Sequence, residues 1–544
     1  MRKIIILTMV CWSFFAANLL AQTVRQQKYQ LPLLKGKDLN PVLRLAVEIP
    51  EAGQLNAVTV NIPENIGDIE NIQLLALNQD SSFVNDAKIQ KATVFSSAMP
   101  KKGKQIKLNG NFALKAGNNY FWLTLKLKGS ADLQHHLDLS IADVKVNGKQ
   151  LKPNQPQAIK QAVAIALRQR NQDQVLSHRI PGLATAMDGS LLAIYDARYT
   201  VARDLQGHID IGLSRSTDKG KTWLPMQVVL DMGEWGGLPQ KFNGVSDACI
   251  LVDKNSGDIY VAGLWMYGVI NDKGVWVEGL TEKSEDWNHQ WKTKGSQPGF
   301  DVKQTAQFLI VKSTDNGKTW SKPVNITKMA KKEEWWLWAP APGQGITLKD
   351  GTLVIPTQGR DAKGKPFSNI TYSKDSGKTW QTSNPAVKEE TTENMAVEMT
   401  DGTVMLNMRA NSNRTDTSSH NGRAIAVTNN LGQTWLEHET SHKALQEPTC
   451  MASIIRHDYT RNGKRQSVLL FCNPNSKVAR NFITVKASKD DGKTWDSKVL
   501  LDEWKGRGYS CMTSIDNDTI GVLYESSQAD LVFQTIELKD LVNN

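Results

Sequence analysis

Several arginines, carboxylates and a tyrosine occur singly between the repeated segments that fill much of this 544-residue chain. In chain order they are Arg179, Arg198, Asp204, Glu393, Arg409, Arg480, Tyr509 and Glu525. A planar guanidinium binds a carboxylate through two parallel hydrogen bonds, so converging arginines would form a site for a carboxylate-bearing ligand. Such distant residues can meet only if the fold brings them together, and the repeats between them indicate which fold.

A polar segment that ends in tryptophan recurs along the second part of the chain. Its copies are SRSTDKGKTW at 214–223, KSTDNGKTW at 312–320, YSKDSGKTW at 372–380, VTNNLGQTW at 427–435 and ASKDDGKTW at 487–495. In this segment, called the Asp-box below, aspartate can accept hydrogen bonds within a turn, glycine supplies a positive φ, and tryptophan packs as an apolar plug. Catalysis would not need five copies, so we expect these segments to stabilise the fold.

The spacing of the Asp-boxes predicts a β-propeller. Their first hydroxyl residues are 97, 60, 55 and 60 residues apart, at Ser216, Ser313, Ser373, Thr428 and Ser488. A period near 60 with short β-type runs suits one four-stranded blade per repeat, and about six blades fit into residues 175–544. The wide first interval contains a Trp-rich insertion around 264–295.

Residues 22–155 lack the Asp-box. Alternating runs such as LNAVTVNI and LDLSIADVKV, separated by Gly, Asn and Pro turns, predict an antiparallel β-sandwich. Residues 156–174 are a linker or the first propeller strand, because AIKQAVAIALRQR fits a helix or a strand by period alone. We therefore expect an all-β protein, with a six-bladed β-propeller preceded by a small β-sandwich.

Residues 1–21 predict a secretory signal peptide, with Arg2 and Lys3 ahead of an apolar stretch and Ala21 at the cleavage site. An uncleaved membrane anchor is the alternative, disfavoured because the stretch is short and ends without basic residues. No second apolar span follows. We expect an exported protein, periplasmic, secreted or on the cell surface, with no transmembrane segment after signal removal.

The net charge of +10 is spread along the chain without a basic run, which is typical of a solvated surface and indicates no nucleic-acid partner. Four scattered cysteines remain after the signal, too few for a dense disulfide framework. The chain contains no CxxC motif, and we assign His135 and His136 to a strand. We therefore expect no metal site.

Arg-Ile-Pro at 179–181, the Asp-boxes, the Glu393/Arg409 pair and Gly-Tyr-Ser at 508–510 together resemble the bacterial sialidases, exo-acting neuraminidases on a six-bladed propeller. The resemblance covers nearly all of residues 175–535. It implies a retaining exo-α-sialidase that hydrolyses terminal α-linked sialic acid of glycoproteins, glycolipids and oligosaccharides without a cofactor. The N-terminal region resembles the carbohydrate-binding-like domains that precede such propellers.

The family's arginine triad falls on Arg179, Arg409 and Arg480. The three guanidinium groups would bind the carboxylate that sialic acid carries on its anomeric carbon. A single arginine more often makes a surface ion pair. Each of these three, however, lies in a segment that resembles a family motif.

Tyr509 matches the family's nucleophile, a neutral phenol that avoids repulsion from the substrate's own carboxylate. A free phenol has a pKa of about 10, so it needs a base beside it, and Glu393 matches that base. Glu398 is the alternative, but the spacing of sixteen residues to Arg409 favours Glu393. The other interpretation of Tyr509 is a core tyrosine.

Asp204 matches the general acid/base, which protonates the departing oxygen and then activates water. Its loop departs from the commonest family wording, and Asp196 and Asp210 are close alternatives. We prefer Asp204 because it follows Arg198 by six residues. Asp196 is expected to end a strand as a turn residue.

The remaining assignments support the sugar or the arginines. We expect Glu525 to pair with Arg179. Arg198 and Asp247 resemble residues that contact the O4 side of the sugar. Trp265 resembles a wall of the N-acetyl pocket, although a buried core tryptophan fits the sequence nearly as well.

Three other functions fit the same pattern. A propeller lectin would keep the arginines and lose Tyr509, Glu393 or Asp204. A trans-sialidase would pass the sugar to another glycan, and the sequence does not place the acceptor-site aromatics that decide this. The third is hydrolysis of a related keto-sugar acid that lacks the N-acetyl group.

Overall fold

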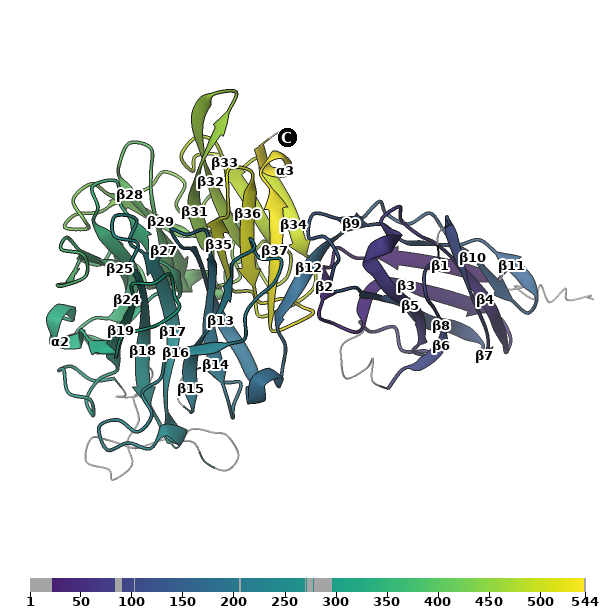
Figure 1. The fold of residues 1–544 in the computed structure, drawn as a ribbon, viewed down its shortest axis with the longest axis horizontal. Coiled ribbons are helices and arrows are strands. Elements are labelled where there is room, and N and C mark those ends of the chain that lie inside the picture. The colour runs from purple at the N-terminus through teal and green to yellow at the C-terminus, as the bar shows by residue number, and fades with distance from the viewer. Residues whose placement is uncertain are drawn as a thin grey trace, which may run out of the picture.

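Strands form nearly all the regular structure of the chain, which confirms the all-β class (Figure 1). The structure, a computed structural model, describes residues 22–83, 91–101, 103–204, 207–269, 271, 277 and 296–542. The expected signal peptide at 1–21 and most of the Trp-rich insertion lie outside the described residues. Within them, no helix is long and apolar enough to cross a membrane.

Two antiparallel sheets form the N-terminal sandwich. One has the order β1 (Thr23–Lys28), β3 (Asn40–Ile49), β8 (Gly117–Leu127), β5 (Ile69–Ala76) and β6 (Thr93–Ala98). The other has the order β11 (Lys149–Leu151), β10 (Ser140–Val146), β4 (Gly53–Asn61) and β7 (Gln105–Leu114). Alternate residues of these strands are apolar and buried between the sheets, for example Leu43, Leu45 and Val47 of β3.

Six antiparallel blades follow in the described part of the chain. The first blade is β13 (Ser177–Thr185), β14 (Leu191–Arg198), β15 (Ile209–Ser216) and β16 (Gln227–Leu230). The second is β17 (Asn243–Val252), β18 (Ile259–Tyr267), β19 (Gln307–Ser313) and β20 (Val324–Asn325). The third has an inner edge broken into β21 (Leu337–Pro340), β22 (Gly343–Gln344) and β23 (Ile346–Thr347), followed by β24 (Leu353–Arg360), β25 (Pro366–Ser373) and β26 (Gln381–Thr382). The fourth is β27 (Thr391–Glu398), β28 (Val404–Ala410), β29 (Ala424–Thr428) and β30 (Leu436–Glu437).

The fifth blade is β31 (Ser453–Arg461), β32 (Lys464–Pro474), β33 (Ile483–Ser488) and β34 (Ser497–Asp502). The sixth contains β35 (Ser510–Ser514), β36 (Thr519–Tyr524) and β37 (Leu531–Glu537). The first strand of each blade contacts the blade that precedes it in the chain. β27, for example, contacts β24 and β25 of the third blade. β35 also contacts β13, so the last blade lies beside the first. This succession is the strand pattern of a six-bladed β-propeller.

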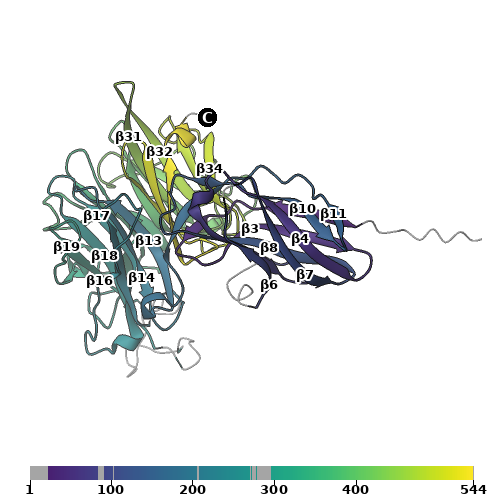
Figure 2. The same ribbon diagram turned by 45° about the vertical axis from the view of Figure 1, so that its right-hand side comes forward.

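The segment that the sequence left open between helix and strand is β12 (Gln161–Arg168), which completes the sixth blade by pairing antiparallel with β37. Two short strands from the sandwich side, β2 (Leu33–Lys35) and β9 (His136–Leu137), pair with β12 in turn. The sandwich therefore lies against the side of the propeller, as both views show (Figures 1 and 2).

The helices are short. Among the residues that the structure describes, they are α2 (Thr327–Ala330) and α3 (Lys539–Val542), with single 3-10 turns at η1 (Ile66–Asp68), η2 (Gln172–Gln174), η3 (Gln240–Phe242) and η4 (Asn411–Arg414).

The Asp-boxes are turns closed by hydrogen bonds, as predicted. In the first copy the Asp218 carboxylate accepts from Ser216 Oγ at 2.8 Å and from Thr222 N and Oγ1 at 2.9 and 2.6 Å. Trp223 Nε1 donates to the Gly220 carbonyl at 3.1 Å, and the indole packs edge-on against Phe533 of the sixth blade. The tryptophan therefore joins two neighbouring blades.

In the copy at 427–435, asparagine replaces the aspartate, and Asn430 Oδ1 still accepts from Thr428 Oγ1 at 2.9 Å and from Thr434 N at 3.0 Å. The third bond is reversed, because Asn430 Nδ2 donates to Thr434 Oγ1 at 2.8 Å. Glycine is not the only left-handed residue in these turns. Lys219 precedes Gly220 with a φ of +61°, and Leu431 precedes Gly432 with a φ of +53°. The hydrogen bonds of the box thus hold a backbone conformation that L-residues rarely adopt.

Replacement of Asp218 tests the structural role of the box. Asp218→Ala removes the acceptor of three hydrogen bonds and should lower the free energy of unfolding by about 1–2 kcal/mol. Asp218→Asn should cost clearly less, because Asn430 fills the same position in the copy at 427–435. Urea unfolding of the three proteins measures both effects. Equal losses for the two substitutions would contradict this role.

Candidate active site

The first strands of three blades break their register where they carry candidate residues. The breaks lie between Arg179 and Gly182 in β13, Ser246 and Cys249 in β17, and Thr391 and Asn394 in β27. A bulge turns a side chain out of the regular alternation of a strand and re-aims it. Arg179, Asp247 and Glu393 lie at these breaks, and Asp247 has a φ of +54°.

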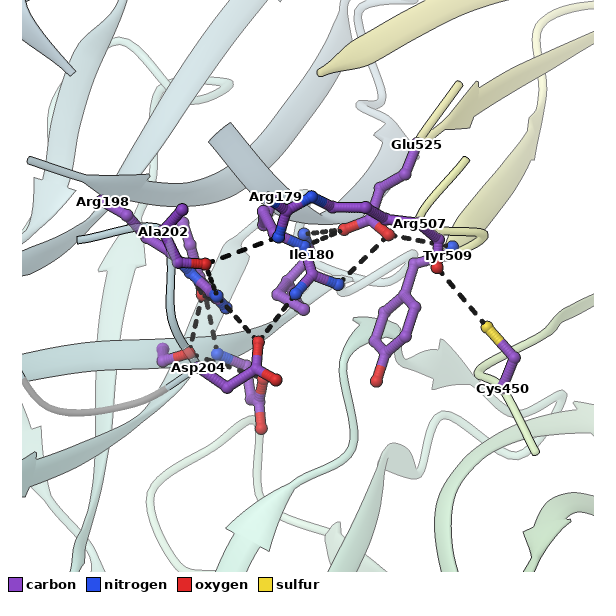
Figure 3. Close-up of polar contacts among 12 residues, drawn as sticks. Arg179, Ile180, Arg198, Ala202, Asp204, Cys450, Arg507, Tyr509 and Glu525 are labelled. Carbon is purple, nitrogen blue, oxygen red and sulfur yellow. Dashed lines mark hydrogen bonds and ion pairs between the residues drawn. The ribbon is translucent and has the colours of Figure 1, made fainter. Parts of the chain in front are cut away.

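Glu525 connects the first blade to the last. Its carboxylate accepts from Arg179 Nε and Nη2 at 2.8 and 3.2 Å, and from the backbone N–H groups of Ile180 and Tyr509 at 3.0 and 3.1 Å (Figure 3). Burial opposes the charge of Glu525, but Arg179 outweighs it and lowers the pKa of the carboxyl group. The pairing expected from the sequence is present, and it also holds the backbone of Tyr509.

The phenol of Tyr509 lies between a base and a cation. Its hydroxyl donates to Glu393 Oε1, and Arg409 Nη1 donates to Glu393 Oε2 at 2.6 Å and to the Tyr509 hydroxyl at 3.2 Å. Arg409 Nε is buried and has no hydrogen-bond partner among the described residues. The three residues thus form one hydrogen-bonded group with an unpaired donor beside it.

The other two arginines flank the Tyr509 ring. The Cζ atoms of Arg179 and Arg480 lie 5.4 and 5.5 Å from the ring centroid. Arg480 donates from Nη1 to the Arg507 carbonyl at 3.0 Å and from Nη2 to the Thr449 carbonyl at 3.3 Å. Three guanidinium groups from separate blades therefore surround one phenol, which makes the site suited to an anionic ligand.

Burial and the nearby Glu393 raise the pKa of Tyr509 well above its ordinary value, against the opposite effect of Arg409 and Arg480. The phenol is therefore neutral at physiological pH. A neutral phenol becomes a nucleophile only when a base takes its proton, and Glu393 is in hydrogen-bond contact with that proton.

Asp204 lies on the loop after β14 and is bound by two arginines. Its Oδ1 accepts from Arg179 Nη1 and from Arg198 Nη1, each at 2.7 Å (Figure 3). The surrounding protein displaces water from the Asp204 carboxylate, which by itself would raise its pKa. The two guanidinium groups outweigh this effect and lower the pKa of Asp204 to about 2. The side chain is still 71% exposed, so it can reach a ligand.

The expectation that Asp196 is a turn residue was wrong. Asp196 lies within β14, is fully buried, and accepts from Arg198 Nη2 at 2.8 Å, from Ser246 Oγ at 2.7 Å and from Asp247 N at 3.2 Å. It is a support for Arg198. Burial and the charge of Asp196 raise the pKa of Asp247 well above its ordinary value.

Two other candidates lie away from this group. Glu398, the alternative base, ends β27 and accepts from Lys349 N at 3.1 Å. Asp210, the alternative acid, lies in β15 and pairs with His208 at 3.3 Å.

Trp265 in β18 is 0% exposed, donates to Asn243 Oδ1 at 3.3 Å and packs edge-on against Trp235. This is the core position that the sequence also allowed, and its role as a pocket wall stays a prediction.

Sequence reasoning missed Arg507 and misjudged Asp196. Arg507 lies two residues before Tyr509, and its Nη1 donates to the Ala202 carbonyl at 3.4 Å, on the loop that carries Asp204. Burial and the neighbouring Arg179 lower the pKa of Arg507. Its only sequence signal was closeness to Tyr509. Cys249, Cys450, Cys472 and Cys511 are free and buried.

The Arg179–Glu525 pair yields a pH-dependent prediction. Glu525→Gln leaves the buried Arg179 with only the exposed carboxylate of Asp204 as a counter-ion and should lower the free energy of unfolding by about 3–5 kcal/mol at pH 7. The folded pKa of Glu525 is lowered, so its contribution is complete above the unfolded value of about 4.3 and falls as pH drops through the folded value.

Urea unfolding of wild type and Glu525→Gln from pH 7 to pH 3 measures this difference, which should narrow in acid. Glu398→Gln is the control, because Glu398 is only partly buried, at the end of β27. This substitution should lower the free energy of unfolding by about 0.5 kcal/mol or less. If the free energies of unfolding of wild type and Glu525→Gln differ by the same amount at every pH, the ion pair does not account for the difference.

Comparison with known proteins agrees with this geometry. A family model described as a BNR repeat-like domain matches residues 180–500, and one described as the N-terminal domain of BNR-repeat neuraminidase matches residues 21–150. A sialidase of Bacteroides fragilis (strain YCH46) is 38% identical over 548 residues, covering 96% of each chain.

A sialidase of Paraclostridium sordellii is 28% identical over 67% of this chain and 84% of its own. The solved structure titled Hadza microbial sialidase Hz136 is 34% identical, with a TM-score of 0.85 over 95% of this chain and 100% of its own. The family models and the relatives thus match both the six-bladed propeller and the sandwich. The chain therefore belongs to the BNR-repeat neuraminidase family, the sialidases.

Proposed function

We propose that this chain is a retaining exo-α-sialidase that removes terminal α-linked sialic acid from glycoproteins, glycolipids and oligosaccharides through a tyrosyl-enzyme intermediate. The observation that carries the proposal is the Tyr509 group: a phenol that donates to Glu393 and is surrounded by Arg179, Arg409 and Arg480. The sialidases that are 38% and 34% identical to this chain support the substrate class.

The three arginines bind the carboxylate of sialic acid. Each guanidinium offers paired N–H donors in one plane, which match the two oxygens of a carboxylate. A carboxylate bound by these arginines around Tyr509 would bring the adjacent anomeric carbon beside the phenol oxygen. The charge of the substrate is then used for orientation, and a neutral nucleophile meets no repulsion.

In the first step the Tyr509 oxygen attacks the anomeric carbon while its proton passes to Glu393. The glycosidic C–O bond breaks, and the departing oxygen takes a proton from Asp204. The products are the free aglycone and a sugar bound covalently to the tyrosine.

In the second step the Asp204 carboxylate takes a proton from water, whose oxygen attacks the anomeric carbon. The bond to Tyr509 breaks, and the phenol recovers its proton from Glu393. Sialic acid leaves with its original anomeric configuration, and both carboxyl groups return to their starting protonation states.

Asp204 changes its protonation as the substrate binds. With Arg179 and Arg198 bound to one of its oxygens, it is an anion at physiological pH. When the substrate carboxylate takes Arg179, Asp204 loses one of these cations and its pKa rises, which favours the protonated acid that the first step requires.

We also propose that the enzyme is exported. The support is residues 1–21, where Arg2 and Lys3 precede an apolar stretch that ends at Ala21.

Tyr509→Phe tests the nucleophile. Loss of the attacking oxygen should lower the turnover of a fluorogenic sialoside at least about 10³-fold, while a slowly released fluorinated sialic acid should add its mass to the Tyr509 peptide of the wild type only. The control is Tyr524→Phe, a buried tyrosine whose hydroxyl donates to Gln534 Oε1 at 3.0 Å. It should keep near-full turnover. If Tyr509→Phe is as active as the wild type, the tyrosyl step is wrong. If the wild type releases no sialic acid, the assignment as a sialidase is wrong.

Asp204→Ala tests the acid. Turnover of sialyllactose should fall about 10²–10⁴-fold, and that of an aryl sialoside much less, because an aryl oxide leaves without protonation. Asp210→Asn, at the alternative position, should show no such dependence on the leaving group. A uniform loss across both substrates in Asp204→Ala would assign Asp204 to another role.

A further inference from the structure

Residues 503–508 connect the end of β34 to Tyr509, and we call this segment the support loop. Its start is fixed to the propeller by Asp502, which is fully buried and accepts from Ser526 Oγ, Ser527 N and Trp504 N at 2.7, 2.8 and 3.1 Å. Its end leads directly into the nucleophile. Its middle contacts both the active site and the N-terminal sandwich.

On the active-site side, the support loop holds Arg480. Gly506 N donates to the Arg480 carbonyl at 3.0 Å, and Arg480 Nη1 donates to the Arg507 carbonyl at 3.0 Å. The Arg507 side chain reaches Ala202, two residues before Asp204, at 3.4 Å. One loop therefore touches an arginine of the triad and the segment that carries the general acid.

On the other side, the sandwich holds the support loop through its backbone. Glu503 N donates to the Gln30 carbonyl at 2.9 Å, and Gln30 N donates to Glu503 Oε2 at 2.9 Å. Gln30 directly follows β1 and Tyr29. These reciprocal bonds join the two domains at the first residue of the loop.

An aromatic cluster completes the junction. The indole of Trp504 stacks on Phe83 with ring centroids 4.2 Å apart and packs edge-on against Tyr29 at 5.5 Å. Phe83 and Tyr29 both pack on Trp122, a fully buried residue of β8. A propeller side chain is thus packed into an aromatic group supplied by the sandwich, and such pairs contribute beyond their buried area.

Electrostatics explain why this loop needs support. Arg507 and Arg480 bring two cations to a site that already contains Arg179, Arg198 and Arg409, and like charges at close range repel. The support loop contacts Arg480 and Ala202 through three hydrogen bonds to backbone carbonyls, two of them donated by guanidinium groups and one by Gly506 N. An anchor outside the site can hold the loop in place before the substrate's carboxylate arrives.

We infer that the N-terminal sandwich takes part in substrate binding by fixing Arg480 and the acid loop through the support loop, with Trp504, Phe83 and Tyr29 as positioning residues. The inference rests on the proposed function. A sub-ångström shift of a guanidinium weakens a bidentate carboxylate contact, so the expected effect is on substrate affinity.

Trp504→Ala and Phe83→Ala remove the stack from either side. Each should raise KM for a fluorogenic sialoside about tenfold and change kcat about twofold or less. Trp504→Phe retains a stacking ring and should recover most of the wild-type KM. The matched control is Phe112→Ala on β7, a partly buried phenylalanine that packs edge-on against Phe121 inside the sandwich.

Phe112→Ala should lower Tm as much as Phe83→Ala and leave KM unchanged. If Phe83→Ala and Trp504→Ala affect KM no more than Phe112→Ala does, the inference is wrong. Hydrogen exchange provides a readout that does not need catalysis. Phe83→Ala should speed exchange at 503–508 and in the neighbouring segment 475–482, and unchanged exchange there would overturn the inference even if the wild type proves to have no sialidase activity.

Discussion

Glu525 is the residue on which the rest of the active site depends. Its buried carboxylate pairs with Arg179 of the first blade and accepts the backbone N–H groups of Ile180 and Tyr509. A buried charge is tolerated only where its partners compensate for lost hydration, and here the partners are one guanidinium and two backbone donors. The same four hydrogen bonds join the sixth blade to the first and hold the backbone of Tyr509 beside Arg179.

Charge balance governs the remaining geometry. Five arginines lie in this site, and carboxylates or backbone carbonyls bind all of them. Arg179 pairs with Glu525 and Asp204, and Arg198 pairs with Asp196 and Asp204. Arg409 pairs with Glu393, whereas Arg480 and Arg507 donate to backbone carbonyls. The carboxylate of Asp204 is the most exposed of these counter-ions. It accepts a hydrogen bond from Arg179, so the proposed mechanism links binding of the substrate carboxylate to protonation of Asp204.

The repeated and the irregular parts of the propeller have different roles. Asp-boxes close equivalent turns with the same hydrogen bonds, and one of their tryptophans joins two blades. Candidate site residues lie where the pattern breaks: Arg179, Asp247 and Glu393 lie at register shifts in β13, β17 and β27. The support loop adds a contribution from the sandwich, whose strands β2 and β9 also extend the sixth blade.

The sequence by itself determined the all-β class, the period of the blades and the Asp-box turns, because each depends on residues close together in the chain. It also predicted the Arg179–Glu525 pair, through family motifs. Only the tertiary structure decided that β12 is a strand, that Asp196 supports Arg198 from inside β14, and that Trp265 is core. These outcomes depend on what packs against a residue from another blade or domain. Local sequence carries no signal for such contacts. For the same reason the sequence did not predict that Arg507 lies at the site or that Trp504 packs against the sandwich.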